Sequence, residues 1–508
     1  MNSTNETAGD RRIYLEAMVD YNRTFGRHDV NAMLLYNQDE LVNNVPGNNL
    51  INSLPKRKQG LAGRLSYAYD GKYMAEVNMG YNGSENFAKG HRWGFFPSIA
   101  LGYNISEESF FEPLRKVITS MKLRGSWGLV GNDQIGGERF IYMPTINLSG
   151  KGFTTGIDQN YGLSGPVYTR YENNSITWEV GEKINLGIDL QLLNSLNIVV
   201  DIFRETRRDI FQKKGTIPTY LGTGNTDVFG NLAEMKNQGL DLSIDYNKAF
   251  SKDFYMNFKG TFTYAHNEIT KYDEAPKYAF QSKVGQSANV SQGYLSNGLF
   301  LDEAEIDRYN QQMGSTLGAG DIKYLNVSNM HGYGDDIVDV DDWTWIGNPT
   351  VPEIVYGFGP SFKYKNWDFS FFFQGVAKTS LFMSGFHPFG DNSLRNVLQF
   401  VANDRWSPTN QNVDAKYPRL TRKTSLNNTN PGNSGRTSDY WMRDGSFLKL
   451  KNMELGYTFK RMRFYISGSN LLTFSKFDLW DPEQGGGSGL KYPTQRVFNV
   501  GFQMTFNN

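Results

Sequence analysis

Residues 497–506, close to the C-terminus, constrain the fold most strongly because apolar and polar side chains alternate there without a break. The apolar positions are Phe498, Val500, Phe502, Met504 and Phe506. A side-chain period of two indicates a β-strand with one apolar and one polar face. With a rise of about 3.3 Å per residue and a tilt near ~45°, this strand would cross roughly 23 Å, about the height of the lipid-facing band of an outer-membrane barrel. A half-buried strand of a soluble β-sandwich shows the same pattern, so this stretch alone leaves both architectures open.

Similar strand patterns recur through the whole chain, and together they predict about fifteen strands. The expected strands are residues 13–24, 29–37, 60–70, 72–82, 91–104, 119–130, 176–190, 196–207, 238–246, 254–266, 352–364, 367–376, 446–459, 462–473 and 497–506. No linker or shift of composition divides them, so we expect one large repetitive domain.

The expected connections alternate between short turns and long loops. Short turns fall at residues 26–28, 71, 191–195, 248–253, 365–366 and 460–461, with a longer connection at 106–118. Long loops fall at residues 38–59, 131–175, 209–237, 267–351 and 377–445. Loops of that length are uncommon in compact soluble domains, whereas outer-membrane barrels have short periplasmic turns and long extracellular loops. The sequence therefore predicts an all-β, antiparallel transmembrane β-barrel.

The number and order of the expected strands favour an incomplete barrel. Single-chain bacterial barrels have an even number of strands, and alternation of turns and loops would start the first of these fifteen or so strands outside the cell. We expect residues 13–508 to be the C-terminal part of a barrel. Residues 1–12 are expected to form a disordered or polar segment, and Met1 to Asp10 have neither the basic n-region nor the apolar h-region of a signal peptide.

The composition narrows the function classes. The formal net charge is zero, which gives no electrostatic basis for binding nucleic acid. The chain has no cysteine, which excludes disulfides and thiolate metal sites. No apolar run reaches the ~18 residues of a membrane helix. Aromatic residues make up 14% of the chain, and barrels place such residues at both membrane interfaces.

The motifs near the C-terminus closely resemble the C-terminal part of the SusC/RagA family of TonB-linked outer-membrane proteins. The matching segments are Asp444-Gly445-Ser446-Phe447-Leu448 with Lys449–Asn452, Leu455-Gly456-Tyr457-Thr458-Phe459, Gly468-Ser469-Asn470-Leu471-Leu472-Thr473, Asp481-Pro482-Glu483 and Tyr492-Pro493. Weaker matches include Arg92 with Gly94, Lys122–Ser126, Trp178-Glu179, Gly320–Tyr324, Arg405-Trp406 and Tyr417–Leu420. The resemblance covers nearly the whole chain.

The resemblance implies a 22-stranded barrel with an N-terminal plug that imports oligosaccharides or peptides. It also implies a SusD-like surface lipoprotein as partner, TonB as the source of energy through the plug, and location in the bacterial outer membrane. The chain departs from this pattern because the signal peptide, the plug and about seven strands are not found in it. It would therefore not transport a substrate by itself.

The motif residues Asp444, Gly445, Ser446, Phe447, Leu448, Gly456, Tyr457, Asn470, Leu471 and Phe506 are interpreted as structural. The apolar residues Leu448 and Leu450 occupy even-numbered positions of this strand, whereas Met453 and Leu455 occupy odd-numbered positions. An extra residue near Lys451 or Asn452 would produce this change of phase, so we expect a β-bulge there.

Two groups in the long loops are candidate ligand sites. Flat aromatic side chains are good platforms for sugars, and the candidates are Trp343, Trp345, Trp406 and Trp441. The acidic residues Asp335, Asp336, Asp339, Asp341 and Asp342 could offer oxygen ligands to calcium, but they lack the spacing of an EF-hand and also fit a solvated loop.

The sequence gives no indication of an enzyme or of a cofactor. The five histidines are scattered without metal-ligand spacing, at His28, His91, His266, His331 and His387. The function we expect is TonB-dependent import across the outer membrane as part of a SusCD-like complex, with the barrel in contact with lipid. A passive porin and a soluble extracellular glycan-binding β-protein are the alternatives.

Overall fold

The computed structural model describes residues 9–44, 54–218, 220, 226–312, 317–334, 336–383, 397–420 and 437–506, and divides the chain into two compact units. Unit 1 comprises Met1–Leu240 and Asn267–Ala275, and unit 2 comprises Asp241–His266 and Pro276–Asn508. Strands β11 and β12 contribute residues to both units. Within the described ranges, no helix has the length and apolar character needed to cross a membrane.

The main sheet has fifteen strands in the order β1-β2-β3-β4-β5-β6-β9-β10-β11-β12-β17-β18-β21-β22-β23, and neighbours such as β1 and β2, β9 and β10, and β22 and β23 are antiparallel. Its first nine strands are β1 (Gly9–Phe25), β2 (His28–Asn44), β3 (Lys56–Tyr69), β4 (Tyr73–Ser84), β5 (Trp93–Asn104), β6 (Ile118–Asn132), β9 (Glu179–Leu192), β10 (Leu196–Lys213) and β11 (Phe229–Ala249). The remaining strands are β12 (Phe254–Lys271), β17 (Ile354–Tyr364), β18 (Trp367–Ala377), β21 (Phe447–Phe459), β22 (Met462–Ser475) and β23 (Val497–Met504).

Each strand expected from the sequence overlaps one strand of this sheet. Several strands extend further towards the loops than the alternation indicated: β2 continues to Asn44, β10 to Lys213, and β11 starts at Phe229 rather than near residue 238. The strand β1 starts at Gly9, so residues 9–12 are strand and not the disordered segment expected from their polarity, whereas residues 1–8 lie outside the described ranges.

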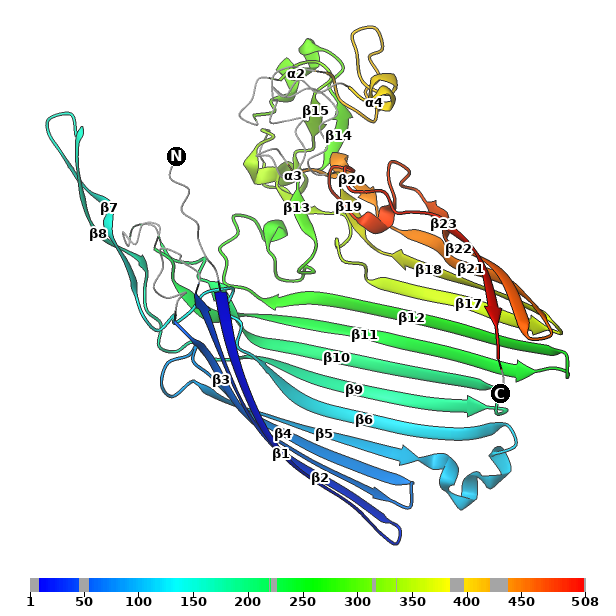
Figure 1. The fold of residues 1–508 in the computed structure, drawn as a ribbon. Coiled ribbons are helices and arrows are strands. Elements are labelled where there is room, and N and C mark those ends of the chain that lie inside the picture. The colour runs from blue at the N-terminus through cyan, green and yellow to red at the C-terminus, as the bar shows by residue number, and fades with distance from the viewer. Residues whose placement is uncertain are drawn as a thin grey trace. The chain divides into compact units, whose positions relative to one another are not determined.

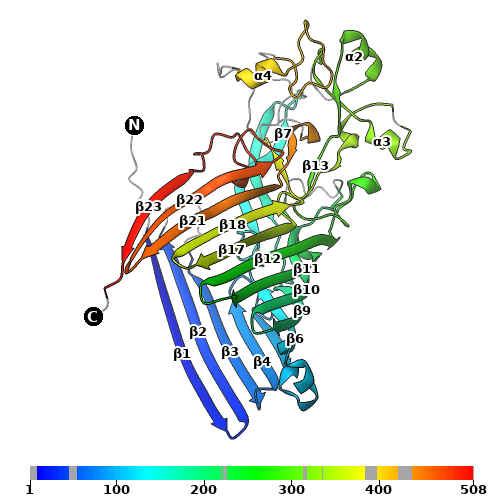
Figure 2. The same cartoon turned by 90° about the vertical axis from the view of Figure 1, so that its right-hand side faces the viewer.

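The strands β17, β18, β21, β22 and β23 of unit 2 lie side by side in Figure 2. Their register gives them one apolar face. Residues directly opposite one another in antiparallel strands share a face of the sheet. One register row on this face contains Val500, Ile466, Leu455, Phe369, Phe362 and Met256. We call this the outer face. Val500 is 87% exposed and Ile466 is 55% exposed, so these side chains do not interdigitate with a second sheet.

The opposite face of the same strands, which we call the inner face, is polar. Its corresponding row contains Asn499, Ser467, Glu454, Ser370, Ser361 and Asn257. A barrel wall between lipid and water has this arrangement: its apolar side chains are exposed on one face, and its hydroxyl, amide and carboxylate groups lie on the other. The packed β-sandwich considered as an alternative would bury the apolar row between two sheets.

Unit 1 has the same two-sided wall, with β1 to β5 adjacent to one another in Figure 1. A row of its outer face contains Tyr21, Ala32, Leu65, Val77, Ile99, Trp127 and Ile184. The corresponding inner row contains Asn22, Asn31, Ser66, Glu76, Ala100, Ser126 and Asn185. Leu65 and Val77 are about half exposed, at 52% and 49%.

Most connections at one end of the strands are short turns and most at the other end are long loops, as expected, but residues 85–92 between β4 and β5 at the loop end form a shorter connection than residues 105–117 between β5 and β6. Two-residue turns join β1 to β2, β17 to β18 and β21 to β22, and Gly26 in the first of them has a φ of +64°. The longest connection at this turn end contains the 3-10 helices η1 (Ile105–Glu107) and η2 (Ser109–Leu114). We refer to the other end of the strands as the loop end.

The long loops contain small sheets and helices that the sequence pattern did not indicate. In unit 1 they form the hairpin β7 (Thr145–Thr155) and β8 (Tyr161–Arg170). In unit 2 they form β13 (Ser291–Gly293), β14 (Ser296–Leu299), β15 (Ile322–Tyr324), β16 (Thr344–Ile346), β19 (Ser380–Phe382), β20 (Met442–Asp444), α2 (Glu303–Tyr309), α3 (Val327–Met330), α4 (Gln399–Asn403), η4 (Ala279–Gln281), η5 (Val340–Asp342), η6 (Asp439–Trp441) and η7 (Pro482–Gln484).

Candidate functional site

The inner face of unit 2 is held by an ion-pair network centred on Arg463. Its Nη2 atom donates to Asp368 Oδ2 at 2.6 Å and to Glu454 Oε1 at 2.6 Å, while its Nε atom donates to Asp368 Oδ1 at 2.8 Å. This network requires a glycine at position 456. A Cβ atom on Gly456 would lie 2.1 Å from Asp368 Oδ2 and 2.6 Å from Arg463 Nη2. The family motif residue Gly456 thus has a steric role on the inner face.

Glu454 of this network also lines a cavity of about 380 Å³ on the inner face. Its polar lining comes from Asn257, Lys259, Ser361, Ser370, Asn452, Glu454, Ser467 and Ser469, and the ring of Phe372 shares their face. Hydroxyl, amide and paired charged groups around an open cavity offer hydrogen bonds in several directions to a hydrophilic molecule.

Unit 1 carries comparable ion pairs on its inner face. Arg124 donates from Nε to Asp189 Oδ1 at 3.0 Å and from Nη2 to Asp201 Oδ2 at 2.6 Å. Arg64 donates from Nη2 to Glu76 Oε2 at 2.6 Å. Positively and negatively charged groups are therefore interspersed on this wall. Neither sign of charge dominates its polar surface.

The expected β-bulge is confirmed at Lys451. Leu450 and Asn452 pair with the adjacent residues Phe373 and Phe372 of β18, which leaves Lys451 as the extra residue. On the other side, the register between β21 and β22 also shifts at this point, where Asn470 has a φ of +55° and its Nδ2 atom donates to the Gln495 carbonyl at 3.0 Å. The bulge changes which parity faces outward and places Leu450 and Met453 on the same face.

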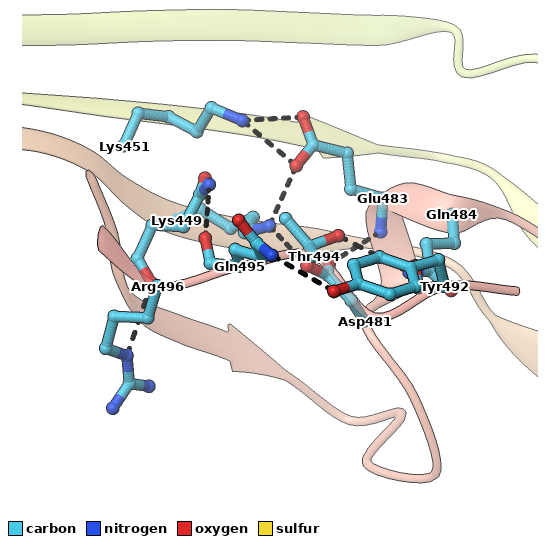
Figure 3. A network of polar contacts seen from close by, with 10 residues as sticks. Lys449, Lys451, Asp481, Glu483, Gln484, Tyr492, Thr494, Gln495 and Arg496 are labelled. Atoms are coloured by element: carbon cyan, nitrogen blue, oxygen red, sulfur yellow. Dashed lines mark hydrogen bonds and ion pairs between the residues drawn. The ribbon is translucent and has the colours of Figure 1, made fainter.

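Lys449, two residues before the bulge, anchors the connection between β22 and β23 (Figure 3). Its side chain is 1% exposed, and Nζ donates to Asp481 Oδ2 at 2.6 Å and to Glu483 Oε2 at 2.8 Å. Lys451 Nζ donates to both oxygens of Glu483, at 2.8 and 3.0 Å. Two lysines of β21 therefore hold the first turn of η7, and the sequence motif Asp481-Pro482-Glu483 supplies both carboxylates.

Acidification is expected to release this connection. Burial, the largest single influence, opposes ionisation of Asp481 and Glu483, but the hydrogen bonds and positive charges around them together outweigh it, with Lys449 the main contributor, so the pKa of each carboxyl lies below its ordinary value. Because the folded pKa is depressed, the stabilisation is complete above the unfolded pKa of about 4 and is lost as the pH falls through the folded pKa. Hydrogen exchange of residues 476–496 should accelerate below about pH 4. In Lys449→Met this pH-dependent step should be largely lost, and an unchanged pH profile in that variant would contradict the assignment.

The long loops of unit 2 pack around one apolar core, which we call the loop core. Its fully buried members are Tyr294, Leu299, Ile322, Tyr324, Met383, Val401 and Trp441, with Trp406 at 5% exposed. Trp406 packs on Gly320, where a Cβ atom would lie 2.4 Å from the indole ring. The expectation that Trp406 and Trp441 act as exposed sugar platforms is therefore wrong in this structure, because the loops that carry them fold around their rings.

A buried ion pair joins two segments of the loop core that are 98 residues apart. Asp321 is fully buried, and Arg419 donates to it from Nε at 2.5 Å and from Nη2 at 3.1 Å. The Arg419 amide also donates to the Gly320 carbonyl at 2.9 Å. The weaker family-like segments Gly320–Tyr324, Arg405-Trp406 and Tyr417–Leu420 meet in this core, and their spacing in the sequence gave no indication of that contact.

Trp343 and Trp345 are partly accessible, whereas Asp342 of the acidic stretch is fully buried. Trp343 packs against the edge of Tyr294 with centroids 5.3 Å apart, and Trp345 donates from Nε1 to the Ser282 carbonyl at 2.8 Å. Asp342 accepts hydrogen bonds from the amides of Ser328 and Asp339, and Asp341 pairs with Lys277. Asp335 and His387 lie outside the described residues. Among the side chains that are described, no group of three His, Asp or Glu residues could hold a metal ion.

The other motif residues occupy structural positions at the start and end of strands. Asp444 accepts a hydrogen bond from the Ser446 amide at 2.9 Å, and the Gly445 amide donates to Thr379. Phe447 is 8% exposed, and Leu448 pairs with Gly375. Tyr457 contacts Trp367 on the outer face with centroids 4.7 Å apart, Leu471 lies over Gly468, and Phe506 is 79% exposed.

Comparison with known proteins shows the same architecture. Residues 2–471 match the family described as TonB dependent receptor-like, beta-barrel. This chain belongs to that family. The resemblance to SusC/RagA proteins is confirmed, since TonB-dependent receptor SusC of Bacteroides thetaiotaomicron is 28% identical over 471 residues, which cover 87% of this chain and 43% of SusC.

Further TonB-dependent receptors show how much of a relative the chain spans. TonB-dependent receptor P3 of Formosa agariphila is 26% identical over 481 residues, which cover 87% of this chain and 45% of P3. The solved RagAB peptide transporter superposes with a TM-score of 0.71 at 20% sequence identity, over 99% of this chain and 56% of that one. The chain thus spans about half the length of the TonB-dependent receptors that it matches.

Proposed function

We propose that residues 13–508 form part of the wall of a TonB-dependent importer in the bacterial outer membrane. The observation that carries this proposal is the register-matched pair of faces, apolar outside and polar inside, in a chain of the TonB-dependent receptor family. The apolar rows would contact lipid and the polar rows would line a water-filled interior. The resemblance to SusC/RagA proteins implies that the complete barrel would have 22 strands.

The cargo we propose is an oligosaccharide or a peptide. The cavity lined by Glu454 offers hydroxyl, amide and paired charged groups, which can bind the hydroxyls of a sugar or the backbone of a peptide equally well. Trp343 and Trp345 of the extracellular loops are proposed to contact the cargo, because both remain partly accessible. No metal, cofactor or catalytic group is needed for this role.

The partners we propose follow from the family. A SusD-like surface lipoprotein would bind over the long loops, and TonB would supply energy through a plug domain. Support for the first partner comes from the named relatives SusC and RagAB, and support for the second comes from the family itself.

Uptake of labelled cargo tests the proposal. Cells that express the complete receptor, with this chain joined to its plug, should accumulate one class of fluorescent oligosaccharide or peptide, and uptake should fall to the level of a deletion strain when a protonophore or removal of TonB abolishes energy coupling. Cargo uptake that survives both treatments would favour the passive porin instead. Recovery of the protein in buffer without detergent would favour the soluble glycan-binding alternative.

A further inference from the structure

A cavity of about 690 Å³ lies in unit 1 at the loop end of β2, β3, β4 and β5, and the proposed import function does not use it. Its lining side chains include Ile13, Glu40, Arg57, Arg92, Trp93 and Phe140. By strand register, Ile13, Glu40 and Arg57 lie directly opposite one another, and Ile13 continues the apolar parity of Leu15, Ala17 and Val19. This cavity therefore opens on the outer face rather than on the polar interior.

The outer face changes from apolar to polar at the level of the cavity. One row contains Tyr36, Leu61, Tyr81 and Phe95. The next row towards the loops contains Gln38, Gln59, Gly83 and Trp93, and the row beyond it contains Glu40 and Arg57. Trp93 stacks on Tyr81 with centroids 4.8 Å apart and planes 13° from parallel. Aromatic residues followed by charged residues mark the level at which lipid chains end and headgroups begin.

The cavity is lined by three carboxylates, those of Asp39, Glu40 and Glu85, and by three cations, those of Arg57, Lys58 and Arg92, and each carboxylate is also paired with an arginine outside the lining. Glu40 accepts from Arg57 Nε at 2.7 Å and lies 3.5 Å from Arg11 Nη2, so one carboxylate serves two guanidinium groups. Arg92 has no carboxylate partner in the described part of the chain, and its Nε atom donates to the Phe87 carbonyl at 3.2 Å. Glu85 is already paired with Arg139 at 2.7 Å.

The rim of the cavity is also preorganised. The Arg92 carbonyl accepts from Trp178 Nε1 at 3.2 Å and from the Ser84 amide at 3.0 Å, which fixes the backbone below its side chain. Arg139 donates to the carbonyls of Leu54 and Pro55, both at 2.9 Å, and so holds the loop that carries Phe140 beside the start of β3. Exposed guanidinium groups on a fixed backbone suit a phosphate group, which accepts two parallel hydrogen bonds from one arginine.

We propose that this cavity binds the phosphorylated sugar headgroup of a glycolipid in the outer leaflet. Arg57 and Arg92 would bind phosphate, Trp93 would contact a sugar ring, and Gln38 and Gln59 would bind sugar hydroxyls. The volume exceeds that of a bare phosphate, and the position next to the apolar face places the acyl chains of such a lipid along β1 to β4. This proposal rests on the proposed outer-membrane location.

The test compares retention of three probes by the purified protein in detergent: bisphosphorylated lipid A, its dephosphorylated form and inorganic phosphate, each measured by native mass spectrometry. We expect retention of bisphosphorylated lipid A, and a weakening of about thirtyfold in the double variant Arg57→Gln/Arg92→Gln, as expected for the loss of two arginines at a membrane surface. Arg27→Gln is the matched control, because Arg27 is equally exposed but lies in the turn between β1 and β2.

Three outcomes would overturn the proposal: equal retention by the double variant and the control, equal retention of the dephosphorylated lipid, or full displacement of lipid A by inorganic phosphate at equimolar concentration. The arginines are exposed, so both variants should keep the far-ultraviolet circular dichroism of the parent. Cargo uptake measured in the same variants separates the two proposals. Lost lipid binding with normal uptake supports the lipid site, whereas absent lipid binding in a parent protein that imports cargo refutes the lipid site alone.

Discussion

Replacement of Arg419 by methionine should destabilise the loop core by about 3–5 kcal/mol, the cost of leaving a buried charge without its partner. Asp321 is fully buried, and Arg419 makes two hydrogen bonds to its carboxylate. Methionine retains much of the aliphatic volume but none of the donors, so the carboxylate would lose its compensating charge. The main sheet does not depend on this pair and should stay folded.

Hydrogen exchange localises the effect of Arg419→Met. Protection should fall in residues 317–334 and 399–420, while the strands β17 and β18 keep theirs. Arg308→Met is the control, since Arg308 is exposed on α2 and donates to the Ala304 carbonyl of its own helix, and its effect should stay within about 0.5 kcal/mol. Adding Asp321→Asn to Arg419→Met should restore part of the stability, because the buried charge is then removed. Equal protection in the Arg419 and Arg308 variants would contradict the role of the pair.

Arginine in place of Phe371 should cost about 2–4 kcal/mol, as expected for a charge on the lipid-facing side near the midplane. Phe371 lies near the middle of the eleven-residue strand β18, on the outer face opposite Met453. Its ring contacts Phe369 and Phe373 with centroids 5.6 and 5.8 Å away. Phe502, another apolar position of the outer face, lies nearer to the end of β23 and is a weaker test.

Two variants separate the lipid-facing cost from other effects of mutating Phe371. Ser370→Arg places the same charge on the inner face, opposite Glu454, and should change stability by much less. Phe371→Leu removes the ring contacts without adding charge and should cost less than about 1.5 kcal/mol. Urea unfolding in lipid vesicles measures all three. Equal costs for arginine at positions 370 and 371 would mean that the two faces do not differ in environment.

The sheet could be predicted from sequence because strand formation here follows a local pattern. Alternation of single side chains identified β23, and the change of parity between Leu450 and Met453 was enough to locate the bulge at Lys451. The start of β11 was missed because Asn231, Glu234 and Lys236 interrupt the apolar alternation in a strand that the structure extends to Phe229.

The loop core could not be predicted because its contacts join segments that are far apart in the chain. Burial of Trp406 depends on its contact with Gly320. The charge of Asp321 is compensated by Arg419, which lies 98 residues further along the chain. A tryptophan in a polar loop has the same local sequence whether its ring is buried or exposed. The opposite charges of Asp321 and Arg419, each inside a family-like segment, were the one signal that could have linked them.

Cysteine labelling along β18 in native membranes tests the two-sided wall most directly, since the chain contains no cysteine of its own. Single cysteines at Ser370, Phe372 and Gln374 should react with a water-soluble maleimide, because these positions lie on the inner face. Cysteines at Phe369, Phe371 and Phe373 should resist that reagent, and a fluorophore attached there after unfolding and refolding into vesicles should be quenched by a lipid-soluble quencher. Reaction at every position without alternation, or alternation of the opposite phase, would contradict the account.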